Sequence, residues 1–140
     1  MTRVDFYTYA PDKLDLARNL TGKAYRQGLR VMLYSEDAQT LADLDQRLWA
    51  QPASSFLPHC ACDAPHAALT PVVLGAQADH LPHDGVLINL HATPPKLFSR
   101  FERVIEIVSL DAADQDAARE RWRFYKQRGY ALHNHDMRAT

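Results

Sequence analysis

The order of apolar runs and helical repeats along the chain constrains its fold more than any other feature. Val4 to Tyr9 is aromatic and β-branched, which is typical of a strand. Leu14 to Gln27 repeats its apolar residues at helical spacing and stops before Gly28. A second strand at Arg30 to Tyr34 and a second helix ending near Trp49 repeat this order. Such connections are right-handed crossovers between parallel strands, so we predict an α/β fold.

The remainder of the chain continues the same alternation. Further strands are expected at Pro71 to Ala76, Val86 to Leu90 and Arg103 to Val108, and Tyr130 to His135 is expected as a final extended segment. Asp111 is the expected cap of a last helix that ends at Gly129, and Ser35 that of the second helix. The sequence contains no internal repeat and no linker. We therefore expect residues 1–140 to form a single Rossmann-like three-layer domain with a mostly parallel central sheet.

The turn after the first strand lacks the glycines by which such folds hold a nucleotide. Residues 9–13 read YAPDK, and Pro11 also removes one backbone N–H donor. Neither G-x-G-x-x-G nor G-x-x-x-x-G-K-[ST] occurs in the chain. The sequence predicts a scaffold like that of nucleotide-binding proteins, without a phosphate-binding loop.

The histidines and cysteines form no recognised catalytic pattern. His59, Cys60 and Cys62 stand close together, but a zinc site needs a second ligand pair, for which His80 and His83 are the available residues. We expect no catalytic residue, no metal and no cofactor. A nucleotide- or metal-dependent enzyme that uses this cluster or the first turn is the alternative.

Charge and hydropathy argue against two classes of protein. The formal net charge is −1, whereas proteins that grip a duplex by its phosphates are usually basic. The chain has no run of the roughly 20 apolar residues that a membrane span needs, and its N-terminus lacks a signal-type apolar region. We expect a cytoplasmic protein that makes no contact with a membrane.

The last predicted helix carries the most informative pattern. On a helical projection, one face is mostly apolar and consists of Ala117, Ala118, Arg121, Phe124 and Tyr125. The opposite face consists of Arg119, Trp122, Arg123 and Lys126. Residues 119–128 contain five cations and one carboxylate, so positive charge is concentrated here.

A tryptophan among cations is suited to a few kinds of ligand. Single-stranded nucleic acid would stack its bases on Trp122, and an acidic peptide would meet the arginines. A solvated basic face with a covered Trp122 is the third interpretation. On the apolar face, Arg121 needs a carboxylate partner, which Glu106 or Asp111 would supply as a structural ion pair.

The segment from Trp49 to His59, WAQPASSFLPH, crowds large apolar groups between prolines. It is either a satellite core beneath a loop or an exposed patch that receives a partner.

These residues resemble the DNA polymerase III chi subunits of bacteria. The family signature L-W-x-x-P-x-x-S-F-x-P-H is matched by Leu48-Trp49, Pro52, Ser55-Phe56 and Pro58-His59. The resemblance continues through Val86 to Leu90, Phe101 to Val108 and Ala118 to Tyr130. It covers essentially the whole chain in the right order.

The resemblance implies a non-catalytic accessory subunit with two protein partners. Family members pair with the psi subunit, which attaches to the clamp loader, and they bind the acidic, phenylalanine-terminated tail of single-stranded-DNA-binding protein. DNA is then reached only indirectly. The matching tail-binding positions are Arg119, Trp122 and Arg123, to which we add Lys126 from the same predicted face; the matching psi-interface positions are Trp49, Phe56 and Pro58. Gln115 stands near a position where some members have lysine.

Overall fold

The computed structural model describes residues 2–49, 57–76, 84–94, 96 and 98–139. The strands are β1 (Arg3–Ala10), β2 (Val31–Tyr34), β3 (His59–Ala61), β4 (Val72–Gly75), β5 (Val86–Asn89), β6 (Arg103–Ser109) and β7 (Ala131–Asp136). The α-helices are α1 (Lys13–Arg26), α2 (Ala38–Trp49) and α3 (Ala112–Gln127), and the 3₁₀ turns are η2 (Ala67–Leu69), η3 (Phe98–Arg100) and η4 (Met137–Ala139). None of the described helices is both long and apolar enough to span a bilayer.

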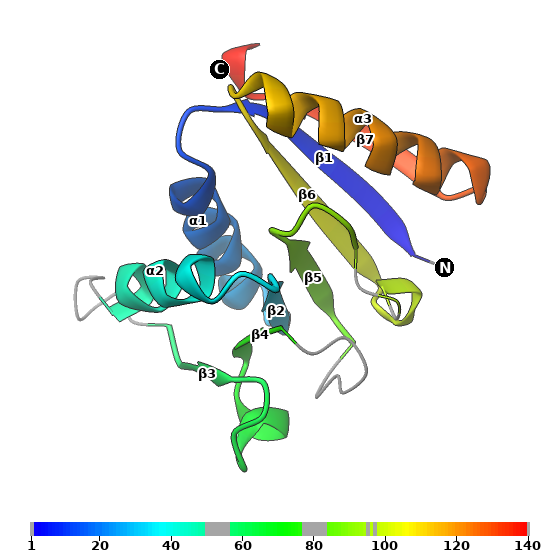
Figure 1. Ribbon diagram of the computed structural model, residues 1–140. Helices are drawn as coiled ribbons and strands as arrows, with labels where there is room; N and C mark the ends of the chain where they lie inside the picture. Colours follow the sequence, from blue (N-terminus) through cyan, green and yellow to red (C-terminus); the bar gives the residue numbers. More distant parts are fainter. Residues whose placement is uncertain (1, 50–56, 77–83, 95, 97, 140) are drawn as a thin grey trace.

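All seven strands join one parallel sheet in the order β3-β4-β2-β5-β6-β1-β7. Alternate residues of β2 show how the helices cover it. Val31 and Leu33 pack in one buried cluster with α1 and α2, while Met32 and Tyr34 pack in another with α3. The two groups of helices therefore lie on opposite faces of the sheet, and α3 runs along β1 (Figure 1). The predicted Rossmann-like three-layer α/β fold is confirmed.

Local polar contacts set where α1 and α3 begin and end. Asp12 and Asp111 accept hydrogen bonds from backbone N–H groups in the first turns of α1 and α3, as predicted for Asp111. Gly28 and Gly129 follow the two helices with φ of 79° and 81°, a left-handed conformation that stops a helix and suits glycine. The expected ends at these glycines are confirmed to within two residues.

The expected cap of α2 was wrong. Ser35 Oγ accepts a hydrogen bond from the Asp37 N–H at 3.0 Å, which forms a tight turn before the helix. The helix begins at Ala38, and Asp37 Oδ2 accepts a bond from Thr40 Oγ1 at 2.7 Å. Aspartate caps helices as well as serine does, so the three polar residues in a row left the start ambiguous.

A carboxylate lies at the helix end where a nucleotide phosphate would bind in a related fold. Asp12 Oδ1 caps α1, and Asp12 Oδ2 accepts a hydrogen bond from Arg47 Nη1 of α2 at 3.1 Å. The hydrogen bonds from the Asp15 backbone and from Arg47 hold the pKa of Asp12 below its usual value. This negative group repels phosphate from the N-terminus of α1, in agreement with the missing glycine loop.

A short edge strand lies where the sequence predicted no strand. His59–Ala61 pairs with β4 as β3, although its residues do not show a strand pattern. Leu57, just before it, is buried in the cluster beneath α1 and α2. Trp49 is 61% exposed at the end of α2, so the apolar residues of this segment are divided between core and surface. Phe56 lies outside the described residues.

Candidate functional site

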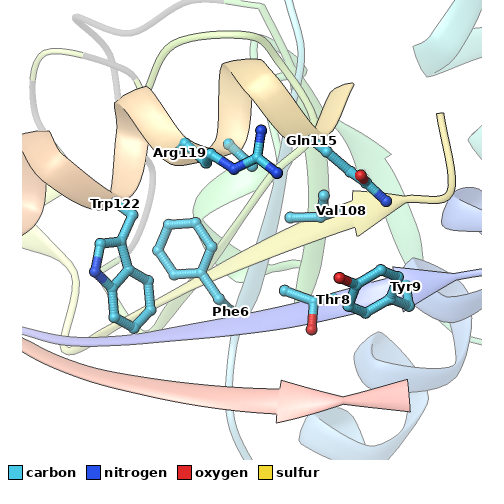
Figure 2. Close-up of a pocket in the computed structure, with 8 residues that line it drawn as sticks. Phe6, Thr8, Tyr9, Val108, Gln115, Arg119 and Trp122 are labelled. Atoms are coloured by element: carbon cyan, nitrogen blue, oxygen red, sulfur yellow. The ribbon is translucent and has the colours of Figure 1, made fainter. Parts of the chain in front are cut away.

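A small pocket of about 170 Å³ lies between α3 and the carboxyl-terminal halves of β1 and β6 (Figure 2). Its lining residues are Phe6, Thr8 and Tyr9 of β1, Val108 of β6, and Gln115, Ala118, Arg119 and Trp122 of α3. Ligands of open parallel sheets bind near the carboxyl ends of the strands. The pocket is thus in the region where the fold favours a binding site, although its lining differs from that of a nucleotide site.

Three features of the sequence produce this pocket. Ala118 is the helix residue that faces the sheet here, and its small side chain leaves space between α3 and the strands. Phe6 alternates to the α3 side of β1 and closes the floor. Arg119 and Gln115 are one helical turn apart and extend from α3 above Val108 (Figure 2). The result is an apolar recess with one guanidinium at its edge.

The helical projection predicted that Trp122 lies on a solvent face opposite the core. The structure differs from this prediction. It is half-buried, and its ring packs edge-on against Phe6 with the centroids 5.1 Å apart at 65°. The physical reason is that Trp122 follows Ala118 by four residues, which places it one turn further along the same side of the helix. A large ring at the border of a face reaches back to the sheet, and one wall of the pocket is formed by this indole.

The structure does not gather the four predicted tail-binding residues on one face. Arg119 and Trp122 line the same pocket. Arg123 lines a separate groove that shares no residue with that pocket, and Lys126 is exposed and lines neither. Arg119 and Arg123 each form an exposed ion pair three residues back along α3, with Asp116 and Glu120.

The strand residues of the pocket were missed by sequence reasoning. Phe6 and Thr8 lie in the segment that was assigned only to the sheet, and Tyr9 was considered only as part of a turn without glycines. Tyr9 has φ 59°, a left-handed conformation that is uncommon outside glycine and is frequently found at functional sites. The available signal was its place at the carboxyl end of the first strand, where related folds bind ligands.

The pocket combines apolar walls with a single charge. Arg119 is the only ionic side chain among its described lining residues. An apolar group can therefore fill the recess while an adjacent anion meets the guanidinium. The volume is below the roughly 300 Å³ at which pockets usually begin to hold whole small molecules. One side chain of a peptide is the ligand size that fits.

A buried ion pair holds α3 against the sheet beside this pocket. Arg121 Nε donates to Glu106 Oε1 at 2.8 Å, so the structure selects Glu106 over Asp111 as the predicted partner. Tyr125 Oη and Asn89 Nδ2 donate to Glu106 Oε2 at 2.7 and 3.0 Å. Complete burial raises the pKa of Glu106, and the charge of Arg121 with these hydrogen bonds opposes the rise. The pair is enclosed and holds two layers together, as a structural ion pair does.

Of the residues predicted for a second interface, Trp49 is the last residue of α2 and Pro58 directly precedes β3, whereas Phe56 lies outside the described residues. Trp49 is exposed, and its ring lies 4.9 Å from that of His59 in an edge-on arrangement. Pro58 is half-buried. His59 is held by its neighbours, since Nδ1 lies 2.7 Å from the Leu57 carbonyl and Nε2 lies 3.2 Å from Asp45 Oδ1. The helix α2, which ends in Trp49, and the helix α3 cover opposite faces of the sheet.

The described residues hold no group of three or more His, Cys, Asp or Glu side chains suited to a metal ion. Cys60 is half-buried and Cys62 is buried, and His80 and His83 lie outside the described part of the chain.

Comparison with known proteins gives a consistent answer. The family described as "DNA polymerase III chi subunit, HolC" matches residues 1–133. The DNA polymerase III subunit chi of Pseudomonas aeruginosa is 39% identical over 98% of both chains. The proteins of the same name from Escherichia coli and Haemophilus influenzae are 29% and 28% identical, each over 84% of this chain and over 80% and 83% of their own lengths.

Proposed function

The chain belongs to the DNA polymerase III chi subunit family, and we propose that it is a non-catalytic adaptor that joins two proteins at the replication fork. The α3 pocket would capture the acidic C-terminal tail of single-stranded-DNA-binding protein. The surface around Trp49 and Pro58 would dock the psi subunit and, through psi, the clamp loader. This role implies a cytoplasmic location and a contact with DNA made through the bound protein.

The observation that carries the proposal is one guanidinium at the edge of an apolar pocket. A phenylalanine at the end of a peptide would place its ring between Phe6, Val108 and Trp122. Its terminal carboxylate and acidic neighbours would then meet Arg119, which is exposed and can turn toward them. The same pocket is too small for a nucleotide and has no second charge to hold one.

The exposed indole of Trp49 supports the second interface. Large aromatic side chains at 61% exposure are unusual on a surface that contacts only water, and tryptophan is enriched at the centres of protein interfaces. Because α2 and α3 cover opposite faces of the sheet, the proposed sites would allow both partners to bind at once. A weak tail contact then becomes effective through the high local concentration on coated DNA.

Peptide titration tests the tail pocket. An acidic peptide of about ten residues ending in phenylalanine should bind, and Arg119→Ala should weaken it at least about tenfold, because a charge-assisted contact is lost. Removing the terminal phenylalanine of the peptide should do the same. Lys23→Ala on α1 removes one cation from the far face and is the matched control. Equal affinity of the wild type and Arg119→Ala would refute the assignment.

Co-purification tests the second interface. A psi subunit expressed with the chain should remain bound to the wild type and be lost from Trp49→Ala, whereas the tail peptide should bind both equally. Loss of the peptide together with psi from a Trp49→Ala protein that remains folded would count against two separate surfaces.

A further inference from the structure

A second groove, of about 800 Å³, lies between α3 and the segment that follows β5. One wall is formed by residues of the last turns of α3 and by Tyr130, and the other by Ala92, Thr93, Pro94 and Lys96 with η3. It shares no lining residue with the smaller pocket beside Arg119. Neither the adaptor role nor the family likeness assigns this groove a ligand.

Positive charge converges on this groove. Four of its lining residues are cations, Lys96, Arg121, Arg123 and Arg128, and one is a carboxylate, Glu120. Glu120 is paired with Arg123, and Glu106 behind the wall is paired with Arg121. Lys96 and Arg128 have no carboxylate partner among the residues that the structure describes. The groove therefore keeps a local positive potential within a chain of net charge −1.

A buried donor without a partner lies in the wall of the groove. Arg121 is only 3% exposed. Its Nε donates to Glu106 and its Nη1 donates to the Ala92 carbonyl at 3.2 Å, but its Nη2 is buried and has no hydrogen-bond partner. Buried polar groups in proteins are almost always satisfied, because an unsatisfied one is costly. An oxyanion that enters the groove and reaches the wall at Arg121 would supply the missing acceptor.

Aromatic and hydroxyl groups in the lining of the groove indicate which class of anion it could bind. Phe124 and Tyr130 line the groove and are half-buried, so part of each ring faces the space. Arg128 lies over the Phe124 ring, 4.0 Å from its centroid. Thr93 and Ser99 add hydroxyl donors. The volume is in the range of pockets for small molecules, much larger than a carboxylate needs. Cations beside aromatic rings are the arrangement that holds phosphate and base together.

We propose that this groove binds the phosphate group of a nucleotide, free or as part of single-stranded nucleic acid. The phosphate contacts Lys96 and Arg128 and completes the hydrogen bonding of Arg121, while the base lies against Phe124 or Tyr130. In a protein recruited to coated DNA, this would be a direct contact beside the indirect one. It does not depend on the tail pocket, whose ligand is a peptide.

The test uses the full-length chain and a fluorescein-labelled oligothymidine of about ten nucleotides at low salt. Lys96→Ala combined with Arg128→Ala should weaken its binding at least about tenfold, because two phosphate contacts are removed. Lys23→Ala combined with Arg26→Ala removes two cations from α1, on the other face of the sheet, and should leave the affinity within about twofold. Both double variants should bind the acidic tail peptide like the wild type.

Two further experiments are needed. One identifies the source of the phosphate, and the other tests the role of the buried arginine. Competition by thymidine monophosphate would indicate a free nucleotide, and competition only by oligonucleotides would indicate a strand. Inorganic phosphate alone should shift the amide NMR signals of Ala92 and Thr93, which adjoin the Arg121 guanidinium.

Three results would overturn the proposal. The first is that neither the oligonucleotide nor thymidine monophosphate binds. The second is equal loss of binding in the α1 and groove variants, which indicates unspecific charge attraction. The third is loss of the acidic peptide, and not of the oligonucleotide, in Lys96→Ala with Arg128→Ala, which makes the groove a peptide site.

Discussion

The guanidinium of Arg138 lies over the ring of Tyr9, with Cζ 3.5 Å from the ring centroid. Arg138 is itself fixed, because its Nε and Nη2 donate to the Asp136 carboxylate at 3.1 and 2.8 Å. Tyr9 in turn lines the α3 pocket with a left-handed backbone. Arg138 of η4 therefore packs against a residue of the candidate peptide site.

We expect Arg138→Ala to weaken binding of the acidic tail peptide by about two- to fivefold, since a cation–π contact of this exposure is worth about 0.5–1 kcal/mol. The measurement is peptide titration by fluorescence anisotropy. Tyr9→Ala gives the control. If Arg138 acts by holding Tyr9, adding Arg138→Ala to a Tyr9→Ala protein should not weaken peptide binding any further. Additive losses would show that the charge of Arg138 attracts the peptide directly.

The layers of this fold were accessible from the sequence because they follow from periodicity. Apolar runs, helical repeats and the glycines after α1 and α3 are local signals, and each specifies its element without help from distant residues. β3 was missed because it depends on a distant strand and not on a local signal. His59–Ala61 has no strand pattern of its own and is extended because β4 offers a free edge for pairing.

The candidate site was only partly accessible for a similar reason. The helix pattern singled out Arg119 and Trp122, but it could not show that Trp122 turns back to Phe6, on a strand more than 100 residues away. A helical projection gives only the angle at which each side chain leaves the helix axis. It takes no account of how long the side chain is or of where the sheet lies. It therefore assigned Trp122 and Arg123 to one surface, although the structure separates them.

The packing of Trp122 on Phe6 predicts that this residue serves stability as well as binding. Trp122→Ala should lower the free energy of unfolding by about 2 kcal/mol, less than for a fully buried tryptophan because the ring is half-exposed. Trp122→Phe should recover most of that loss by keeping a ring against Phe6. The measurement is urea denaturation of both variants. A Trp122→Ala protein as stable as the wild type would contradict the observed contact.

The buried pair of Arg121 and Glu106 predicts a compensating double substitution. Arg121→Met leaves the Glu106 carboxylate buried without its cation and should cost about 3–5 kcal/mol of unfolding free energy. Adding Glu106→Leu removes that charge and should restore much of the loss, although the Tyr125 hydroxyl then lacks its acceptor. Guanidinium denaturation of the single and double variants gives both values. A double variant less stable than Arg121→Met alone would show that Glu106 stabilises the fold through Tyr125 and Asn89 even without its cation.

The buried carboxylate of Asp5 predicts how the fold responds to acid. Asp5 is fully buried, and it accepts hydrogen bonds from Arg103 Nε at 2.8 Å and from Arg3 Nε at 3.1 Å, while His135 Nε2 lies 3.0 Å away. Burial alone raises the pKa of Asp5, but the contacts with His135, Arg103 and Arg3 outweigh it and leave the pKa below its ordinary value.

A carboxyl group whose pKa is lower in the folded state stabilises the fold at pH values above the unfolded pKa of about 3.9. That stabilisation is lost as the pH falls through the lower, folded pKa. We therefore expect the thermal midpoint to drop as the pH falls from about 5 through the folded pKa of Asp5. Asp5→Asn should lower the midpoint at pH 7, because a neutral amide accepts these hydrogen bonds less well, and it should make the acid limb shallower.

Asp116→Asn, at an exposed position of α3, is the matched control and should leave the acid limb unchanged. If the two variants lose stability in parallel over the whole range, Asp5 does not set the acid response, and β7 is held to β1 mainly by its backbone ladder.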